Sequence, residues 1–234
     1  LVNPAYQVAR VHRCIADHLL AVERGEIENL MVEVMPRIGK TDLCSKNFVV
    51  RWLGRNPEDD VVHVTFGLDR ASDVGLDVRN LIASPEVTWC YPELKVDPRS
   101  DAKARLDLVT GGGYRSTAPG SSLTGRGANL FVIDDPCKNA LDADSLSARA
   151  SFRKLWSSTI ERRREPGCPI VICMQRWYEE DPCGWLQREQ PDRWHVLSLP
   201  AIYEGTNEPC CDLGEWRQPG EVLWPEHWTR AKLD

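Results

Sequence analysis

Residues 30–41 read LMVEVMPRIGKT, an apolar run followed by a short loop that ends in Gly39-Lys40-Thr41. The apolar run predicts a buried strand over 30–35, and the pattern that follows predicts a helix over 40–53. A loop between a strand and a helix N-terminus turns backbone N–H groups toward an anion, and the helix dipole adds positive potential there. The segment therefore predicts a phosphate-binding loop.

The side chains of this loop match the needs of a bound nucleoside triphosphate. Lys40 is placed to reach the β- and γ-phosphates, and the Thr41 hydroxyl to ligate Mg²⁺. The other residues predicted to line the nucleotide are Pro36, Arg37, Ile38 and Gly39. Val34 stands where the usual G-x-x-x-x-G-K-[ST] pattern has its first glycine, so an accidental turn is the alternative. The strand–loop–helix context favours nucleotide binding.

Similar apolar runs alternate with helical patterns along the rest of the chain. Further strands are predicted at 61–66, 130–133, 169–174 and 194–199, an extended segment at 105–110, and helices at 71–82 and 152–160. This alternation is typical of an α/β fold with crossover helices, so we predict a three-layer αβα sandwich around a mostly parallel sheet. Gly111 to Gly113 predict a turn, and the Gly/Ser-rich stretch 114–126 predicts a loop.

The apolar periodicity fades from about Glu204 onward, where Pro, Gly, Trp and acidic residues dominate. A tail of roughly 30 residues is too short to fold alone without disulfides or a metal. We therefore expect one domain over 1–203, followed by a linker or docking tail over 204–234.

The composition narrows the function classes. The chain has 234 residues, of which 42% are hydrophobic and 27% charged, as in ordinary globular proteins. It contains no apolar run of about 18 residues, so we expect no membrane span. Its nine cysteines are odd in number and lack metal-site spacing, which favours reduced thiols. The net charge of −6 argues against a surface that is basic all over, although nucleic-acid binding needs only a local stripe of Lys and Arg.

Two adjacent carboxylates, Asp134 and Asp135, end the apolar run at 130–133. Open parallel sheets bind ligands beyond the carboxyl ends of their strands. We expect Asp134 to hold Mg²⁺ through its water shell and Asp135 to orient or deprotonate the attacking water. The alternative, that both residues open a turn before Pro136, is favoured for this motif alone. The phosphate loop upstream reverses that preference.

Two further polar residues are candidates for roles around the γ-phosphate. Arg126 lies between two glycines ahead of the acidic strand, and an arginine there is suited to stabilise charge that develops during phosphoryl transfer. A solvated loop arginine is the alternative. Gln175 follows the run at 170–174 and carries an amide able to sense the γ-phosphate. The basic cluster 162–164 is about equally consistent with a DNA-backbone contact and with a solvated helix end.

Taken in order, the motifs resemble those of phage terminase large subunits, and the resemblance spans essentially the whole chain. The segments that carry it are 35–41 (MPRIGKT), 111–114 (GGGY), 123–128 (LTGRGA), 132–136 (VIDDP), 175–181 (QRWYEED), 199–202 (LPAI) and 223–226 (LWPE). This chain departs from the family pattern at the loop, which lacks a second Pro and a His around Arg37, and at Gln175, where Thr is common.

The resemblance implies an ASCE-type P-loop ATPase that uses ATP and Mg²⁺ to drive double-stranded DNA into a procapsid. It implies a homo-oligomeric ring, often a pentamer, that docks on the portal protein and receives DNA from a small terminase subunit. It places such a protein in the host cytoplasm and allows a monomer in isolation. By the same resemblance, Tyr6 and Gln7, with His12 following, form the adenine-side motif that precedes the loop, and Arg37 would change position with nucleotide state. The family's nuclease would lie beyond Asp234, so we expect no DNA cleavage.

Two alternatives stay open from the sequence. One is another ASCE ATPase that remodels nucleic acid in the manner of a helicase, which would share Lys40 and Asp134. The other is a module that binds nucleotide without turnover, which Val34 in place of glycine and Asp135 in place of the more usual Glu favour.

Overall fold

A seven-stranded sheet forms the centre of the structure, a computed structural model that describes residues 7–100, 102–121, 127–205 and 216–233. The strands are β1 (Asn29–Val34), β2 (Asp60–Thr65), β3 (Arg105–Asp107), β4 (Gly113–Thr117), β5 (Leu130–Asp134), β6 (Ile170–Met174) and β7 (His195–Leu199). They lie in the order β3-β4-β2-β5-β6-β1-β7. All neighbouring pairs are parallel except β3 and β4. The predicted mostly parallel sheet is confirmed.

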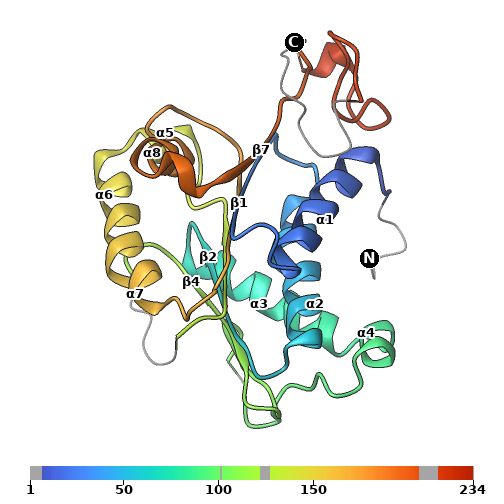
Figure 1. Cartoon of the computed structure of the whole chain (residues 1–234), viewed down its shortest axis with the longest axis vertical. Coiled ribbons are helices and arrows are strands. Elements are labelled where there is room, and N and C mark those ends of the chain that lie inside the picture. Colours follow the sequence, from blue (N-terminus) through green and yellow to red (C-terminus); the bar gives the residue numbers. More distant parts are fainter. Residues whose placement is uncertain (1–6, 101, 122–126, 206–215, 234) are drawn as a thin grey trace.

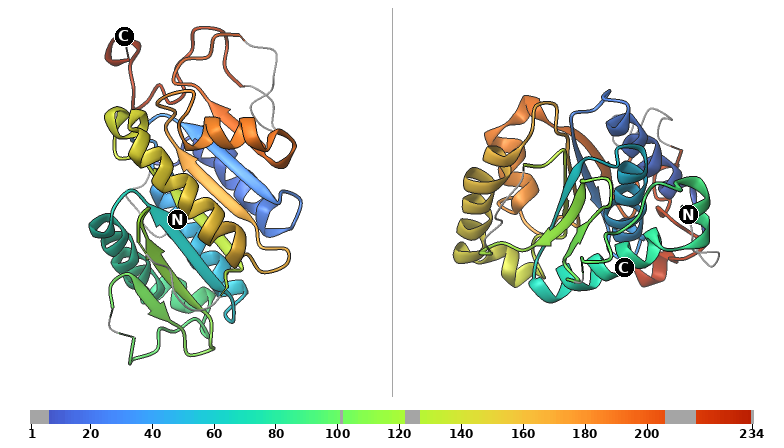
Figure 2. Two further views of the ribbon diagram at one scale, coloured as in Figure 1. Left: turned by 90° about the vertical axis from the view of Figure 1, so that its left-hand side faces the viewer. Right: turned by 90° about the horizontal axis from the view of Figure 1, so that it is seen from below.

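Helices cover both faces of this sheet (Figures 1 and 2). One face carries α1 (Arg10–Glu23), the π-helix η1 (Thr41–Asn47), α2 (Phe48–Arg55), α3 (Leu68–Ile82) and α4 (Pro85–Cys90). The other carries α5 (Ala140–Asp144), α6 (Leu146–Leu155), the π-helix η2 (Trp156–Ile160), α7 (Glu161–Arg163) and α8 (Pro182–Glu189). Two 3₁₀ turns, η3 (Pro191–Arg193) and η4 (Arg230–Lys232), complete the described elements. The predicted three-layer arrangement is confirmed.

Each face of the sheet has its own hydrophobic core, because alternate residues of a strand point to opposite sides. Val132 packs with α1, η1 and α2, whereas Phe131 and Ile133 pack with α6 and α8. Since both faces are covered, the central strands are continuous apolar runs and do not alternate with polar residues. That is why these strands were recognisable in the sequence but their two faces were not.

One strand contradicts the sequence prediction. The stretch 114–126 is expected to be a loop, yet β4 occupies 113–117 and pairs with β2 in parallel and with β3 in antiparallel register. Its side chains pack against β2: the buried Tyr114 ring stacks on His63 with centroids 6.1 Å apart, and the Ser116 hydroxyl lies 2.7 Å from Nδ1 of the same buried His63. Tertiary pairing therefore outweighs the weak strand propensity of a Gly/Ser-rich segment.

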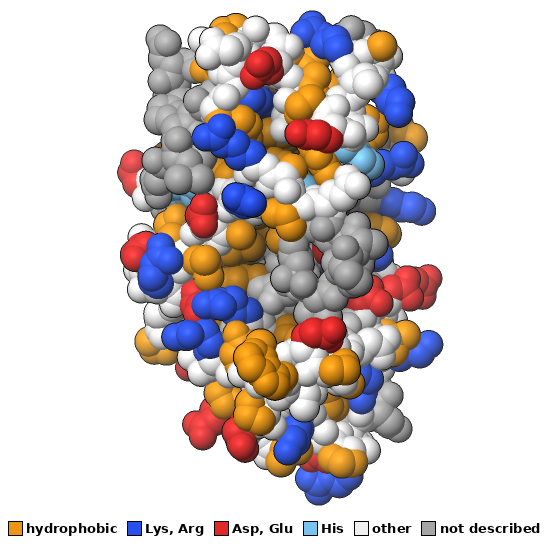
Figure 3. Space-filling view, turned by 90° about the vertical axis from the view of Figure 1, so that its right-hand side faces the viewer, with side chains coloured by type: hydrophobic (Ala, Val, Ile, Leu, Met, Phe, Trp, Pro, Cys, Tyr) orange, Lys and Arg blue, Asp and Glu red, His pale blue; other side chains and the backbone are white. Residues whose placement is uncertain are grey.

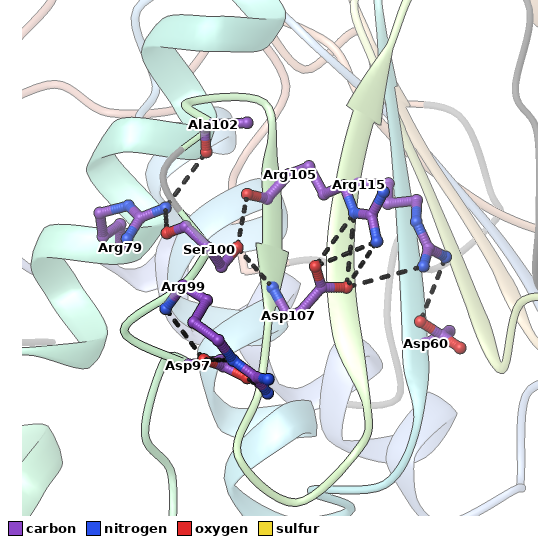
Figure 4. A network of polar contacts seen from close by, with 9 residues as sticks. All are labelled: Asp60, Arg79, Asp97, Arg99, Ser100, Ala102, Arg105, Asp107 and Arg115. Atoms are coloured by element: carbon purple, nitrogen blue, oxygen red, sulfur yellow. Dashed lines mark hydrogen bonds and ion pairs between the residues drawn. The ribbon is translucent and has the colours of Figure 1, made fainter.

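Ion pairs hold this edge of the sheet together, as Figure 4 shows. Arg115 of β4 lies 3.2 Å from Asp60 of β2 and 3.9 Å from Asp107 of β3. Arg105 contacts the same Asp107 carboxylate at 3.1 Å. The alternating charges join three strands across their width, and they explain why polar side chains occur in β3 and β4. The predicted turn at 111–113 is confirmed: Gly111 adopts a φ of +106°, and a Cβ on Gly112 would lie 2.5 Å from the Asp59 carbonyl oxygen.

The described part of the C-terminal tail, residues 216–233, packs on the side of the sheet that carries α1. Val222 bridges Ile202 in antiparallel fashion, and Leu223 N–H donates to the Ala201 carbonyl at 2.8 Å. Leu223 and Trp224 are buried in the same core as α1 and β1. The tail, although it lacks apolar periodicity, thus contributes two large side chains to the domain core.

None of the described helices is long and apolar enough to cross a lipid bilayer. The described cysteines are free thiols: Cys14, Cys44, Cys90, Cys137, Cys168, Cys173 and Cys183. Burial raises the pKa of both Cys137 and Cys168 to about 12, so these two stay protonated near neutral pH.

Candidate functional site

The loop between β1 and η1 has the backbone geometry of a tight turn at a helix N-terminus. Arg37 and Gly39 adopt φ angles of +60° and +78°, in the left-handed region that is costly for a non-glycine residue. Pro36 and Arg37 are exposed, whereas the Ile38 side chain is fully buried and fixes the loop to the core. The helix predicted over 40–53 is present, begins as the π-helix η1 and runs to Arg55. Such π segments often occur at functional sites.

Lys40 is the buried cation of this site, with only 5% of its surface exposed. Its Nζ lies 2.8 Å from Oδ2 of Asp135, at the end of β5. Burial alone would lower the pKa of Lys40, but the charge and hydrogen bond of Asp135 outweigh it, and the pKa is raised. The lysine is therefore charged at neutral pH, and the contact joins the two motifs that the sequence predicted to converge.

Asp134 is the last residue of β5 and is 2% exposed. Its neighbours across the sheet are Thr65 of β2 and Cys173 of β6. The Cys173 thiol lies 3.4 Å from Oδ1, and a thiol is a weak hydrogen-bond donor. The buried Lys40 ammonium supplies part of the positive charge that this carboxylate needs. A carboxylate at a strand end is also a hard oxygen ligand of the kind that binds hydrated Mg²⁺. The residues present therefore fit Mg²⁺.

Asp135 turns the chain out of β5 with a φ of +42°, which is unusual for a non-glycine residue. Its N–H donates to the Cys173 carbonyl at 3.0 Å, and its Oδ1 accepts from the Gln175 N–H at 3.3 Å. Burial raises the pKa of the Asp135 carboxyl; Lys40 opposes this rise and Asp134 adds to it. Backbone strain and a perturbed carboxyl beside a buried lysine are typical of functional sites.

The structure brings most of the predicted site residues to one end of the sheet. Thr41 opens η1, which contacts β5 and β6, and Gln175 follows β6 directly beside Asp135. Gln7 is exposed just ahead of α1. Tyr6 and Arg126 lie outside the described residues, so their roles stay predictions.

One charged cluster beside the site was not anticipated. Arg176 donates from Nη1 to Glu33 of β1 at 2.9 Å and from Nε to Asp181 at 3.0 Å. Glu33, Gln175 and Arg176 share a cavity of about 270 Å³ with Met35, at the start of the loop between β1 and η1. The cluster thus links the segment after β6 to β1, the strand that leads into the predicted phosphate loop. A glutamate within a predicted buried strand was the available signal, since such a charge requires a partner.

Asp181 organises the segment after β6. It is fully buried and accepts N–H groups from Trp177 at 2.9 Å and from Gly184 at 2.9 Å, in addition to Arg176. A carboxylate that receives several donors at a helix N-terminus both caps α8 and fixes the turn before it. The position of Gln175 at the start of this turn therefore depends on Asp181.

Replacing Asp181 with alanine is expected to lower the free energy of unfolding by about 3–5 kcal/mol, because Arg176 and the backbone donors would lose their buried acceptor. Urea denaturation followed by circular dichroism measures this change. Asp192→Ala, which removes an exposed aspartate in η3, is the matched control and should change the stability by less than about 0.5 kcal/mol. Equal stability of the two variants would contradict the organising role.

The basic cluster 162–164 is partly used within the fold. Arg164 donates to the Cys168 carbonyl and to Asn29 at 3.2 Å, and it lies 3.0 Å from Glu28. Arg162 is exposed. Arg164 therefore closes the turn between α7 and β6, and of the two interpretations of this cluster its contacts favour a structural role for that residue.

No family model and no curated protein sequence matches the chain. Among solved structures, the fold is similar to the HK97 bacteriophage large terminase, with a TM-score of 0.55 and 17% identity over 85% of this chain and 41% of that chain. For the Thermus phage P74-26 large terminase ATPase domain, the TM-score is 0.50 and the identity 16%, over 73% of this chain and 66% of that one. A mutant of that domain gives a TM-score of 0.55 and 15% identity over 95% of this chain and 85% of the other. These likenesses establish the fold, and the chain spans about two fifths of the HK97 protein.

Proposed function

We propose that this chain is the ATP-hydrolysing motor domain of a viral terminase large subunit, which drives double-stranded DNA into a procapsid. The observation that carries the proposal is the 2.8 Å contact between Lys40 and Asp135. It places a buried ammonium, the hydroxyl-bearing start of η1 and two adjacent carboxylates at one end of a parallel sheet. This is the combination that triphosphate hydrolysis requires, and the fold likeness to terminase ATPase domains supports the same function.

Each residue has a defined task in this proposal. The backbone N–H groups of residues 37–40 and the Lys40 ammonium hold the phosphates. Thr41 and Asp134 hold Mg²⁺, which when bound supplies positive charge to the phosphate oxygens. Asp135 accepts the proton of the attacking water or orients that water. When Lys40 turns to the phosphates it leaves the Asp135 carboxylate, so substrate binding itself would free the base.

Residues on neighbouring elements would complete the site. Gln175 adjoins Asp135 through its backbone N–H, and its amide is proposed to respond to the γ-phosphate. Arg176 follows Gln175 directly and donates to Glu33, so a movement of Gln175 would also shift this contact with β1. Arg126 is proposed as the arginine finger, acting within its own subunit or across a subunit interface. Tyr6 and Gln7 are proposed on the adenine side.

The proposed partners follow from the same function: double-stranded DNA, a portal protein, a small terminase subunit and further copies of this chain in a ring. Residues 1–203 would form the ATPase domain, and 204–234 a linker that docks back on it. On the face that α1, α2 and α4 form, acidic and basic side chains are interspersed (Figure 3). DNA is better held by a local stripe of one sign, so we do not assign DNA contact to that face.

Steady-state release of phosphate, measured at high protein concentration with Mg²⁺, tests the proposal. We expect ATP turnover that double-stranded DNA stimulates more than single-stranded DNA does, without unwinding of a duplex. Stimulation by single strands with unwinding would instead indicate a helicase-like ATPase. Turnover no higher than that of Lys40→Ala would indicate a nucleotide-binding module. Nicking of a plasmid with Mg²⁺ or Mn²⁺ would contradict the expected absence of nuclease activity.

The pH dependence of hydrolysis should report Asp135. Its pKa is raised above the ordinary value of 3.8, so on acidification it takes up a proton at a higher pH than an ordinary aspartate. A protonated carboxyl can neither accept the proton of water nor pair with Lys40, and kcat/KM should therefore fall as the pH decreases through this pKa. Measurement of kcat/KM against pH checks this, and persistence of the same acid limb in Asp135→Asn would contradict the assignment.

A further inference from the structure

His12 of α1 is joined directly to the phosphate loop. The side chain is 1% exposed, and its Nε2 lies 2.9 Å from the Ile38 carbonyl oxygen. Its Nδ1 accepts the Ala9 N–H at 2.7 Å, so the hydrogen must reside on Nε2 and donate to Ile38. Burial lowers the pKa of His12, His227 adds to this effect, and the hydrogen bond to Ile38 opposes it. The neutral ring that both contacts require is thereby favoured.

The contact with Ile38 fixes the orientation of one peptide group in the loop. In a planar trans peptide the carbonyl and the following N–H point in opposite directions. Because the Ile38 carbonyl faces His12, the N–H of Gly39 faces the other side of the loop, away from α1. Gly39 holds a φ of +78°, which allows the chain to keep this orientation while it enters η1. An N–H held in this way is available to a phosphate oxygen.

The C-terminal tail holds His12 from the other side. The Trp224 ring meets the His12 ring edge to face, with centroids 4.6 Å apart and planes at 88°. His227 stacks on Trp224 at 4.5 Å and 22°, and Trp228 contacts His227 at 5.4 Å. Trp224 is 9% exposed, and the adjacent Leu223 is anchored to Ala201 by the backbone bond described above. An aromatic stack thus runs from the tail to the histidine that contacts the phosphate loop.

We propose that the tail segment 222–228 is a strap that sets the affinity of the site for nucleotide, with His12 as the positioning residue between strap and loop. The inference rests on the proposed nucleotide site and adds a regulatory connection to it. Undocking of Trp224 would release His12, and His12 would then cease to orient the Gly39 N–H. Any partner that pulls on the tail would weaken nucleotide binding, and bound nucleotide would in turn favour the docked tail.

Replacing His12 with Asn or with Gln tests its two hydrogen bonds one at a time. The amide of Asn can reproduce Nδ1 and accept from Ala9, whereas the amide of Gln reaches the place of Nε2 and can donate to Ile38. We expect His12→Asn to raise the Kd for a non-hydrolysable ATP analogue with Mg²⁺ about tenfold, because this change in affinity corresponds to the loss of about one buried hydrogen bond. His12→Gln should stay within about threefold of the wild type. Fluorescence titration with the analogue measures the Kd of each variant, and thermal melting measures whether the variant is still folded.

The strap itself is tested by Trp224→Ala, alone and combined with His12→Asn. Because both changes act through one contact, the Kd of the double variant should resemble that of the weaker-binding single variant. Trp194→Phe, a buried tryptophan of the opposite core, is the matched control and should leave the Kd unchanged. Equal Kd values for His12→Asn and His12→Gln, or additive effects in the double variant, would overturn the strap while the nucleotide site stands. Absence of binding by the wild type would overturn the proposed function as well.

Discussion

Lys40→Ala is expected to reduce kcat/KM for ATP by about a thousandfold or more, because the variant loses the buried cation that we propose holds the β- and γ-phosphates. Lys40 is 5% exposed, so a cation from solvent cannot easily enter the buried position that its ammonium leaves in the variant. Asp135 would also lose its ion-pair partner, and its carboxyl would be protonated more readily. Steady-state phosphate release and nucleotide titration together measure the effect on turnover and on binding.

Lys46→Ala is the matched control for this variant. Lys46 lies in η1, which Lys40 immediately precedes, and it pairs with Asp42 at 2.7 Å and with Asp77 at 2.8 Å. The proposed chemistry does not use this part of the helix. We expect its kcat/KM to stay within about threefold of the wild type, since a partly exposed ion pair stabilises the fold only slightly. Comparable losses in both variants, with normal melting curves, would show that Lys40 has no special role.

Asp135→Asn is expected to lower kcat by about 10²–10⁴-fold, the usual contribution of a general base, while nucleotide affinity changes little. The amide has the shape of the carboxylate and can still accept the Gln175 N–H, so the turn after β5 should persist. It cannot take a proton from water. Single-turnover hydrolysis, which separates chemistry from binding and product release, is the appropriate measurement.

Two further variants make this experiment specific. Asp135→Glu restores the charge with one more methylene and should recover most of the lost rate. Asp144→Asn neutralises an exposed carboxylate of α5, which pairs with Arg149 at 2.6 Å, and should leave kcat unchanged. A wild-type rate in Asp135→Asn would remove Asp135 from the proposed chemistry, and Asp134 or a bound water network would then have to be considered as the base.

Those parts of the candidate site that lie within short sequence motifs could be predicted from the sequence. The loop 35–41 lies between a continuous apolar run and a helical pattern, and Asp134 ends another such run. Parallel strands align their carboxyl ends, so two motifs of this kind are expected at one edge of the sheet. The contact between Lys40 and Asp135 is the geometric result of that alignment.

The remaining features depend on contacts between distant parts of the chain. β4 is a strand because His63 and Asp60 of β2 receive its polar side chains, and no pattern within 113–117 shows that. The contact of His12 with Ile38 and Trp224 joins three segments that are far apart in sequence, and a single histidine in an amphipathic helix predicts no such contact. Strand order, with β6 between β1 and β5, likewise follows from packing and not from local propensity.

A crystal structure with a non-hydrolysable ATP analogue and Mg²⁺ tests the central claim most directly. We predict that the Lys40 ammonium leaves Asp135 for the phosphate oxygens, and that Thr41 and Asp134 flank the metal ion. Nucleotide bound at another place, or Lys40 still paired with Asp135 while the phosphates lie elsewhere, would contradict it.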